Sequence, residues 1–235
     1  MIYIESGDTQ PRRLSYYLAM EEYVAQHILR GEDCFFMWQV TPSVIFGRNQ
    51  VPQNEVNIDY CRRHGIAMFR RKSGGGCVYA DMSNVMLSYI TPDENVDQTF
   101  SRYLDMVAGS LQAMGIDAHK NDHNDIMIGD RKVSGNAIYH LPGSNIAHGT
   151  LLYDTDMENM LKAITPSRQK LDKHGVESVR QRICLLKDYT PIPFADIRAR
   201  LRASLCEHHY TLTAKDQAGI ADIEREYLDP TFIGI

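Results

Sequence analysis

The stretch Arg70-Arg71-Lys72-Ser73-Gly74-Gly75-Gly76-Cys77-Val78-Tyr79 lies between two apolar runs, 66–69 and 85–90, that are typical of β-strands. Three consecutive glycines between strands cost backbone entropy unless the chain needs a positive φ or a close approach to another group. Backbone N–H groups in such a loop can surround an anion, and the preceding cations supply positive charge. The stretch therefore indicates either a ligand-binding loop or a tight turn beside a solvated basic face. It matches neither G-x-x-x-x-G-K-[ST] nor G-x-G-x-x-G.

Around this stretch, short β-type runs alternate with segments of helical periodicity. We expect strands at residues 2–5, 34–40, 44–46, 66–69, 85–90 and 145–153, and a hairpin of 125–128 and 132–138 that turns at Gly129-Asp130. We expect helices at residues 14–29, 58–64, 100–114, 157–164, 194–207 and 218–227. This order predicts an α+β fold with a mixed, largely antiparallel sheet flanked by helices. No linker marks a boundary, so we expect one domain over 1–235, with the mostly helical 191–235 as a candidate sub-lobe.

The composition excludes several classes of protein. The chain has 235 residues, of which 43% are hydrophobic and 23% charged, as in a globular domain. Its net charge of −5 disfavours a dedicated nucleic-acid binder. No apolar run approaches the roughly 18 residues of a membrane span, and the N-terminus lacks the apolar core of a signal peptide. The five cysteines are widely spaced without a C-x-x-C pair, which predicts no zinc cluster or disulfide framework and favours the cytoplasm.

A second constellation comprises Asn124-Asp125 and the run Asp130-Arg131-Lys132-Val133-Ser134-Gly135-Asn136-Ala137. On a hairpin, Asp125 and Lys132 can face one another across the two strands. The carboxylate would then hold a metal ion and the ammonium a phosphate oxygen at one site. The alternative is a surface hairpin with a cross-strand ion pair worth less than ~1 kcal/mol.

The third segment is His148-Gly149-Thr150-Leu151-Leu152-Tyr153-Asp154, at the start of a predicted strand. His148 can line a pocket there, or it can be a structural or exposed residue. The eight other histidines show no metal-ligand spacing. Cys77 is a candidate nucleophile, although its place at the start of an apolar strand favours a packing role.

Taken in order, RRxSGGGxVYxDxxN, NDxxxxxRKVSGxA and HGTLLYD resemble the lipoate–protein ligase A family of the biotin and lipoate ligase superfamily. The similarity extends to Pro42-Ser43-Val44-Ile45-Phe46-Gly47-Arg48-Asn49-Gln50 and to Gly175-Val176-Glu177-Ser178-Val179-Arg180, and it covers most of residues 1–190. The Asn-Asp and Lys-Val-Ser-Gly pieces recur in biotin ligases. The triple glycine separates the two groups, because biotin ligases carry a G-R-G-R type of loop there.

The resemblance implies an ATP-dependent reaction in which the carboxylate of lipoate becomes lipoyl-adenylate and pyrophosphate leaves. The acyl group then passes to a specific lysine of a lipoyl domain, and AMP is released. The implied cofactors are ATP and Mg²⁺. The implied partners are the lipoyl domains of 2-oxoacid dehydrogenase complexes or the H protein of glycine cleavage, with no nucleic acid and no membrane.

The resemblance also assigns roles to residues. Lys132 matches the family lysine that contacts both the acyl carbonyl and the phosphate, a task that suits a compact charge on a long stem. The residues expected at the adenylate are Arg71, Gly76, Cys77, Val78, Tyr79, Asn124, Asp125 and Lys132, with Mg²⁺ at Asp125. The residues expected at lipoate are Ser73, Gly74, Gly75, Asn84, Lys132, Gly135, Ala137 and His148. A dithiolane on an apolar tail needs an apolar tunnel, for which Val44, Phe46 and Val78 are the candidate walls.

The sequence departs from the family pattern at two places. Cys77 replaces a small apolar residue after the third glycine. The chain also ends at Ile235, where longer relatives continue into a small C-terminal accessory domain. We therefore expect that domain to be absent, adenylation to be weak or dependent on a separate accessory protein, and transfer from preformed lipoyl-adenylate to be retained.

Three other functions compete with the ligase. An octanoyl- or lipoyl-transferase that uses an acyl-carrier or protein donor can share this fold, but its acyl-accepting cysteine usually lies between the Gly-rich loop and the lysine hairpin, and residues 78–131 contain no cysteine. A biotin ligase is disfavoured by the loop. A non-catalytic binder of lipoyl domains or a ligand-sensing regulator is disfavoured by the intact Lys132 and triple glycine.

Overall fold

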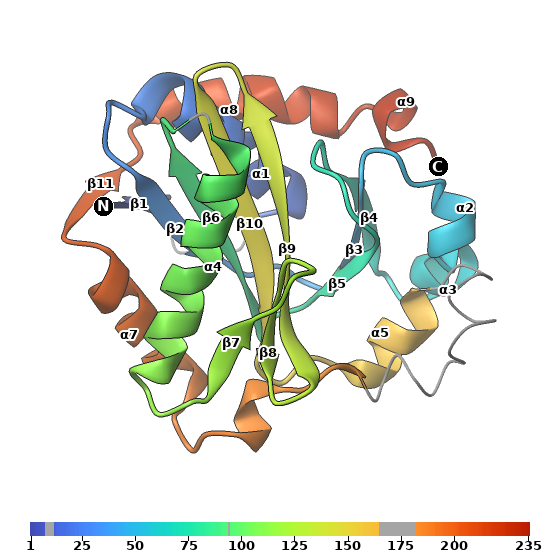
Figure 1. The fold of residues 1–235 in the computed structure, drawn as a ribbon. Coiled ribbons are helices and arrows are strands. Elements are labelled where there is room, and N and C mark those ends of the chain that lie inside the picture. Colours follow the sequence, from blue (N-terminus) through green and yellow to red (C-terminus); the bar gives the residue numbers. More distant parts are fainter. Residues whose placement is uncertain (8–11, 94, 165–181) are drawn as a thin grey trace.

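A large mixed sheet forms the centre of the fold in the computed structural model, which describes residues 1–7, 12–93, 95–164 and 182–235 (Figure 1). The described residues give eight strands in the order β11-β1-β2-β6-β10-β9-β8-β7. β1 runs parallel to β2 and β11, and the other neighbours are antiparallel. The strands are β1 (Ile2–Glu5), β2 (Cys34–Trp38), β6 (Asn84–Thr91), β7 (Ala118–Lys120), β8 (Asp125–Ile128), β9 (Arg131–Leu141), β10 (Ser144–Leu152) and β11 (His208–Thr211). The predicted α+β fold with a mixed, largely antiparallel sheet is confirmed.

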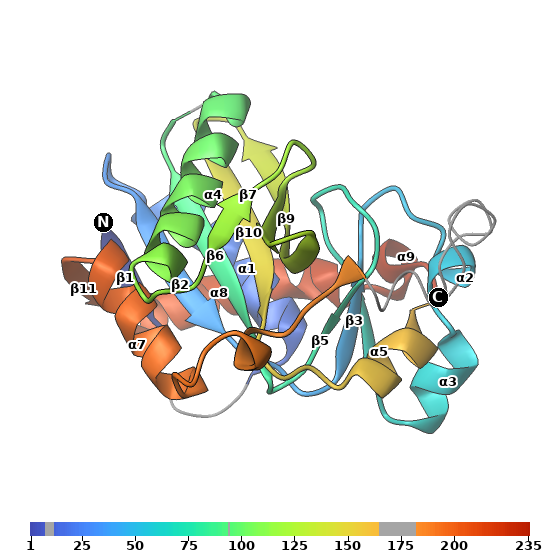
Figure 2. The ribbon, with the colours of Figure 1, turned by 60° about the horizontal axis from the view of Figure 1, so that its bottom comes forward.

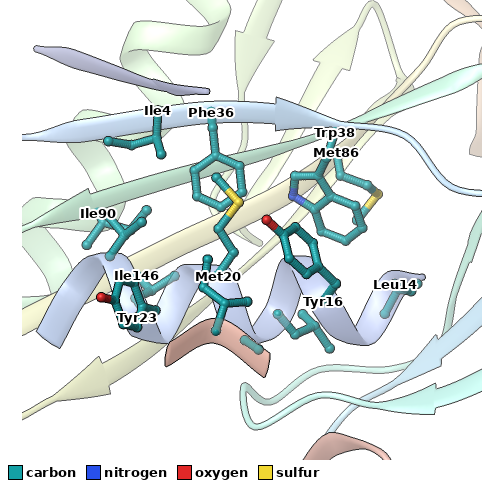
Figure 3. Close-up of a cluster of buried hydrophobic side chains, with 14 of the residues drawn as sticks. Ile4, Leu14, Tyr16, Met20, Tyr23, Phe36, Trp38, Met86, Ile90 and Ile146 are labelled. Carbon is teal, nitrogen blue, oxygen red and sulfur yellow. The ribbon is translucent and has the colours of Figure 1, made fainter. Parts of the chain in front are cut away.

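Helices cover both faces of this sheet (Figures 1 and 2). α1 (Leu14–Tyr23), its π-helical continuation η1 (Val24–Ile28) and α8 (Ala214–Tyr227) pack on one face, and α4 (Val96–Gln112) and α7 (Phe194–Leu205) pack on the other. Side chains of a strand alternate between its faces. Phe36 of β2 accordingly packs with α1, whereas the preceding Phe35 packs with α4. Figure 3 shows Met20 and Tyr16 of α1 turned toward Phe36 and Trp38.

A second, smaller sheet contains the two strands that flank the Gly-rich loop. Its order is β4-β3-β5, with β3 (Ser43–Phe46) parallel to β4 (Ala67–Arg70) and antiparallel to β5 (Val78–Ala80). Its outer face packs against α3 (Ile58–Arg63) and α5 (Met157–Ala163) in a third hydrophobic cluster. The remaining short helices are α2 (Pro52–Glu55), η2 (Leu186–Asp188) and α9 (Pro230–Ile233).

The predicted hairpin is confirmed, because β8 and β9 pair directly and Gly129 turns with a φ of +60°. The helix expected over 14–29 is divided, since its last turn widens into η1. The sequence prediction missed β11, because His208-His209-Tyr210-Thr211 carries no apolar alternation. This strand lies at the edge of the sheet and pairs with β1, its partner from the other end of the chain. None of the helices in the described part of the chain has the length and apolar composition needed to cross a membrane.

Candidate active site

The Gly-rich loop between β4 and β5 is built around the buried Arg71. The Arg71 side chain is 5% exposed, and its guanidinium donates to the carbonyl oxygens of Gly74 at 2.6 Å, Gly76 at 2.9 Å and Ile45 at 3.2 Å. Burial lowers the pKa of Arg71 to about 10, which leaves the guanidinium charged at neutral pH. Arg71 therefore organises the loop from within the protein.

The hydrogen bonds accepted by the loop carbonyls of Ser73 and Gly74 fix the direction of the loop's N–H groups. In a trans peptide the N–H points opposite to the carbonyl. Since the carbonyl of Ser73 accepts from the Arg48 amide at 3.0 Å and the carbonyl of Gly74 accepts from Arg71, the N–H groups of Gly74 and Gly75 point away from those donors. Successive outward N–H groups form the kind of concavity that binds anions. A Cβ on Gly47 would collide with the carbonyl oxygen of Gly75, so a glycine is needed where β3 ends beneath the loop.

The two cations beside Arg71 are also engaged with protein groups. Arg70 donates to the carbonyl of Arg48 at 2.8 Å and to that of Phe232 in α9 at 2.8 Å. Lys72 is 13% exposed and forms ion pairs with Glu22 at 3.0 Å and Glu226 at 2.8 Å. Burial opposes the charge on Lys72, but these two carboxylates raise its pKa above the ordinary value. The alternative interpretation, in which Arg70, Arg71 and Lys72 form a solvated basic face, is therefore wrong.

Lys132 and Asp125 meet on the β8–β9 hairpin, as predicted. The Lys132 Nζ lies 2.9 Å from Asp125 Oδ1, and the two side chains are 39% and 21% exposed. The register shifts between Ile126 and Met127, so that Asp125 pairs with Gly135. The Lys132 side chain extends along β9 toward Gly135 and thereby reaches Asp125. A Cβ on Gly135 would lie 2.7 Å from Lys132 Cε and 2.8 Å from its Nζ. Gly135 thus leaves the space that the lysine side chain occupies.

Asn136 is a residue of this hairpin that the sequence prediction did not assign to the site. Its amide donates to the carbonyl of Asn124 at 3.0 Å, and its oxygen accepts from the Ser134 hydroxyl at 3.1 Å. Asn124 is the sole non-glycine with a positive φ, +68°, among the described residues. A Cβ on Gly149 of β10 would overlap Asn136 Oδ1, so that glycine makes room for the amide. Asn136 holds the turn that presents Asp125.

His148 connects β10 to the Gly-rich loop. It is 7% exposed, and its Nε2 lies 2.7 Å from the Ser73 hydroxyl. Its Nδ1 lies 2.8 Å from the carboxylate of Glu21, a residue of α1 that the sequence prediction missed. A signal for Glu21 was present, because Glu21 and Glu22 lie within the otherwise apolar Leu18–Val24 segment. His148 pairs with Ala137 on β9, so the loop and the lysine hairpin are joined through neighbouring strands.

Other predicted site residues lie in the surrounding structure. Asn84 is 1% exposed, and its amide donates to the carbonyl of Tyr79 at 3.3 Å and to Thr155 Oγ1 at 3.2 Å. Val44 and Phe46 belong to the cluster under α3 and α5, whereas Val78 packs toward α1. The prediction that these three side chains line one tunnel is therefore wrong, because they point to opposite faces of the small sheet. The stretch Gly175–Arg180 lies outside the described residues.

Cys184, whose thiol donates to the carbonyl of Arg131 on the hairpin, is poorly suited to be a nucleophile. Cys184 donates its backbone N–H to the carbonyl of Lys132 at 2.9 Å, and its side chain is buried. Burial raises the pKa of the Cys184 thiol, as it raises that of Cys34 to about 12 and that of Cys206 to about 11. These three thiols stay protonated at neutral pH, and the thiolate is the reactive form.

The chain is thus an α+β domain in which a Gly-rich loop and a hairpin with a Lys–Asp pair lie on connected strands. Such groups can stabilise negative charge on a substrate. The profile of the lipoyl protein ligase A/B catalytic domain family matches residues 14–206, and the chain belongs to this family. The family predicted from the sequence motifs is confirmed.

Curated relatives and solved structures agree with this family. Lipoate-protein ligase LplJ of Bacillus subtilis is 30% identical over 238 residues, which cover 96% of this chain and 71% of the relative. Lipoate–protein ligase 1 of Staphylococcus aureus is 36% identical over 177 residues, or 75% of this chain and 54% of the relative. A bipartite lipoate protein ligase of Thermoplasma acidophilum superposes with a TM-score of 0.87 at 24% identity, covering 99% and 96% of the two chains. A lipoate-protein ligase A crystallised with ATP gives 0.84 at 24% identity, covering 99% and 98%. The two solved structures show the shared fold, and the chain spans about half to 71% of the length of the curated relatives it matches.

Proposed function

We propose that this chain attaches lipoate to a lysine of lipoyl domains, using ATP and passing through lipoyl-adenylate. The observation that carries the proposal is the meeting of two features in one family-matched domain: outward N–H groups on the Gly-rich loop, and Lys132 held beside Asp125 on the neighbouring hairpin. Among the similar structures, one contains bound lipoic acid, another bound ATP, and a third is described with its E2 lipoyl domain.

The chemistry needs a fixed cation at two points. In the first step a carboxylate oxygen of lipoate bonds to the α-phosphorus and pyrophosphate leaves. In the second, the lysine amine of the carrier domain bonds to the acyl carbon, loses a proton, and AMP leaves with the bonding pair. Negative charge grows on the phosphate oxygens and then on the carbonyl oxygen, where a preorganised donor stabilises the transition state most. Lys132 is the residue we assign to both steps.

The remaining residues divide between contact and support. We assign Gly76, Cys77, Val78, Tyr79, Asn124 and Asp125 to the adenylate, and Ser73, Gly74, Gly75, Gly135, Ala137 and His148 to lipoate. The resemblance assigns Arg71 to the adenylate and Asn84 to lipoate. We propose that they serve these ligands by holding the loop in shape, since their donors are bonded to loop carbonyls and to Thr155. Because β11 pairs with β1 and α8 packs on α1, we also propose that residues 1–235 act as one catalytic domain.

The donor set of the hairpin fits Mg²⁺. The ion usually binds through one or two carboxylates and completes its shell with water and substrate phosphates. Asp125 offers a partly exposed carboxylate, and the described residues contain no cluster of three or more acidic, His or Cys side chains that would form a complete protein cage. Asp125 would therefore hold Mg²⁺ together with the nucleotide, and the ion would neutralise phosphate charge there.

Lipoyl domains of 2-oxoacid dehydrogenase complexes and the H protein of glycine cleavage are the partners we propose. We place the reaction in the cytoplasm, in keeping with five widely spaced cysteines that form no C-x-x-C motif.

The test uses the purified chain with α-labelled ATP and lipoate, with and without a lipoyl domain. We expect the chain alone to form labelled lipoyl-adenylate only weakly, and to release free AMP with lipoylated domain when the lipoyl domain is added. A second reaction started from synthetic lipoyl-adenylate isolates the transfer step. Acylation of the domain from an octanoylated carrier protein in the absence of ATP, with no labelled adenylate in the first assay, would instead identify a transferase.

A further inference from the structure

Two consecutive glutamates of α1 are buried beside the Gly-rich loop. Glu21 is 3% and Glu22 is 4% exposed, which is rare for carboxylates unless they are paired. Glu22 contacts Lys72 and accepts from the Tyr227 hydroxyl of α8. Glu21 contacts His148, whose other nitrogen contacts Ser73. The two carboxylates therefore act on adjacent residues of the loop, Lys72 directly and Ser73 through a histidine.

The hydrogen-bond chain through Glu21 has a defined direction. The indole N–H of Trp38 can only donate, and it donates to the Ser88 hydroxyl oxygen at 2.9 Å. Ser88 in turn donates to Glu21 Oε1 at 2.5 Å. The second carboxylate oxygen, Oε2, accepts from His148 Nδ1 at 2.8 Å, so in the neutral ring the proton is on Nδ1 and Nε2 carries a lone pair.

This direction determines what Ser73 does. In the neutral ring His148 Nε2 is an acceptor, so the Ser73 hydroxyl donates to it across their 2.7 Å contact. The serine side chain is thereby held in one rotamer, at the first residue of the Ser73-Gly74-Gly75 segment. Although Ser73, His148 and Glu21 follow the order of a hydrolase triad, Ser73 is 2% exposed and is enclosed within the protein.

We propose that Glu21 is a positioning residue for the acyl-binding loop: it fixes the Nδ1–H tautomer of His148, and through it the rotamer of Ser73 and the lipoate-binding shape of the loop. The role at lipoate rests on the proposed function. The tautomer of His148 does not depend on the proposed function, so the tautomer and the role at lipoate can be tested separately.

The first test is spectroscopic. Long-range ¹H–¹⁵N correlation spectra distinguish the two imidazole tautomers, and the His148 ring is assigned by the loss of its signals in His148→Asn. We expect the Nδ1–H form in the unmodified protein. In Glu21→Met, which keeps the length but removes the acceptor, the ring should shift toward the Nε2–H form. An Nε2–H ring in the unmodified protein would overturn the proposal without any need for a Glu21 variant.

The second test measures lipoate binding by calorimetry and kcat in the lipoylation assay. Glu21→Met and Ser73→Ala should each weaken lipoate binding about tenfold, the effect of losing one buried hydrogen-bond partner, with a smaller change in kcat. Because Glu21 acts through Ser73, the double variant should bind lipoate no more weakly than the weaker single variant. Additive losses would contradict the proposal.

Glu224→Gln is the matched control, since Glu224 on α8 accepts from Ser15 of α1 at 2.6 Å instead of contacting the loop. Its lipoate affinity should equal that of the unmodified protein. If the unmodified chain binds lipoate but attaches none to a lipoyl domain, the proposed function fails while the positioning role of Glu21 stands.

Discussion

The reach of Lys132 depends on a residue without a side chain. The lysine lies along β9 over Gly135, where a Cβ would approach its terminal carbon to 2.7 Å. The ion pair therefore depends on three residues: Lys132 supplies the ammonium, Asp125 supplies the carboxylate, and Gly135 leaves the space between them.

Gly135→Ala should push the lysine side chain off Asp125 and slow lipoylation by at least about tenfold, because small misplacements of a catalytic group cost this much or more. Single-turnover lipoylation of a lipoyl domain measures the effect. Gly109→Ala is the matched control, since nothing lies within 4 Å of a Cβ at that exposed position of α4. It should leave the rate unchanged and raise the free energy of unfolding by about 0.5–1 kcal/mol. Equal rates for both variants would show that Lys132 is not constrained at Gly135.

Lys132→Ala should slow both adenylate formation and acyl transfer by about 100- to 1000-fold, the usual cost of losing one preorganised donor at a transition state. Lys132→Arg should restore little, because a planar fork does not replace a point charge. Reactions started from ATP and from synthetic lipoyl-adenylate measure the two steps. Arg131→Ala is the control, since the Arg131 guanidinium stacks on Tyr189 at 5.6 Å. If Arg131→Ala is inactive while Lys132→Ala stays active, the assignment of Lys132 is refuted.

Among the secondary-structure elements, α8 connects the last part of the chain to the site. Its Asp216 forms a capping box with Thr213 and also accepts from Tyr23 of α1 and Tyr210 of β11, each at 2.9 Å. A Cβ on Gly219 would overlap the ring of Tyr23, so α8 packs closely on α1. At the other end of α8, Glu226 holds Lys72. The helix thus joins α1, β11 and the Gly-rich loop.

The charge of Asp216 should make stability depend on pH. Burial alone would raise its pKa, but hydrogen bonds from Thr213, Tyr23 and Tyr210 lower it from 3.8 to about 2. A depressed carboxyl pKa contributes stability that is present above about pH 4 and is lost as the pH falls toward 2. Asp216→Asn should therefore reduce the free energy of unfolding on the order of 2 kcal/mol at pH 7. Urea unfolding should show this difference shrinking between pH 4 and pH 2, and a difference independent of pH would argue against the charge as its source.

At the scale of the whole molecule, the acyl site that we propose lies between the Gly-rich loop of the small sheet and β10 of the large sheet. The Gly-rich loop connects β4 to β5, and its Ser73 contacts His148 of β10. Because both sheets contribute residues to the proposed site, we expect its choice of acyl group to depend on the assembled fold.

We expect calorimetry to show binding of lipoate with its carboxylate near Lys132, and no appreciable binding of biotin. The physical reason is that three glycines and the buried Arg71 shape this loop, which lacks the G-R-G-R type of sequence that biotin ligases carry there. Lys132→Ala should weaken lipoate binding, which places the carboxylate. An affinity for biotin equal to or above that for lipoate would overturn the prediction.

The sequence by itself determined the elements with strong local signals. Apolar periodicity located most strands and helices, Gly129-Asp130 located the hairpin turn, and the order of three motifs identified the family. The pairing of Asp125 with Lys132 was also predictable, because both residues belong to one hairpin and few residues separate them. Such features depend on neighbours in the sequence, where backbone geometry leaves few choices.

The tertiary structure alone decided which polar groups are satisfied by partners far along the chain. Arg70, Arg71 and Lys72 look like an exposed cationic run in the sequence, yet they bind carbonyls of α9, loop carbonyls and the carboxylates of Glu22 and Glu226. Glu21 of α1 contacts His148 of β10, 127 residues further along the chain, and β11 pairs with β1 from the opposite end of the chain. A buried charged side chain needs a partner, but its residue type does not determine which residue that partner is. Only the folded chain, which brings distant segments together, makes that choice.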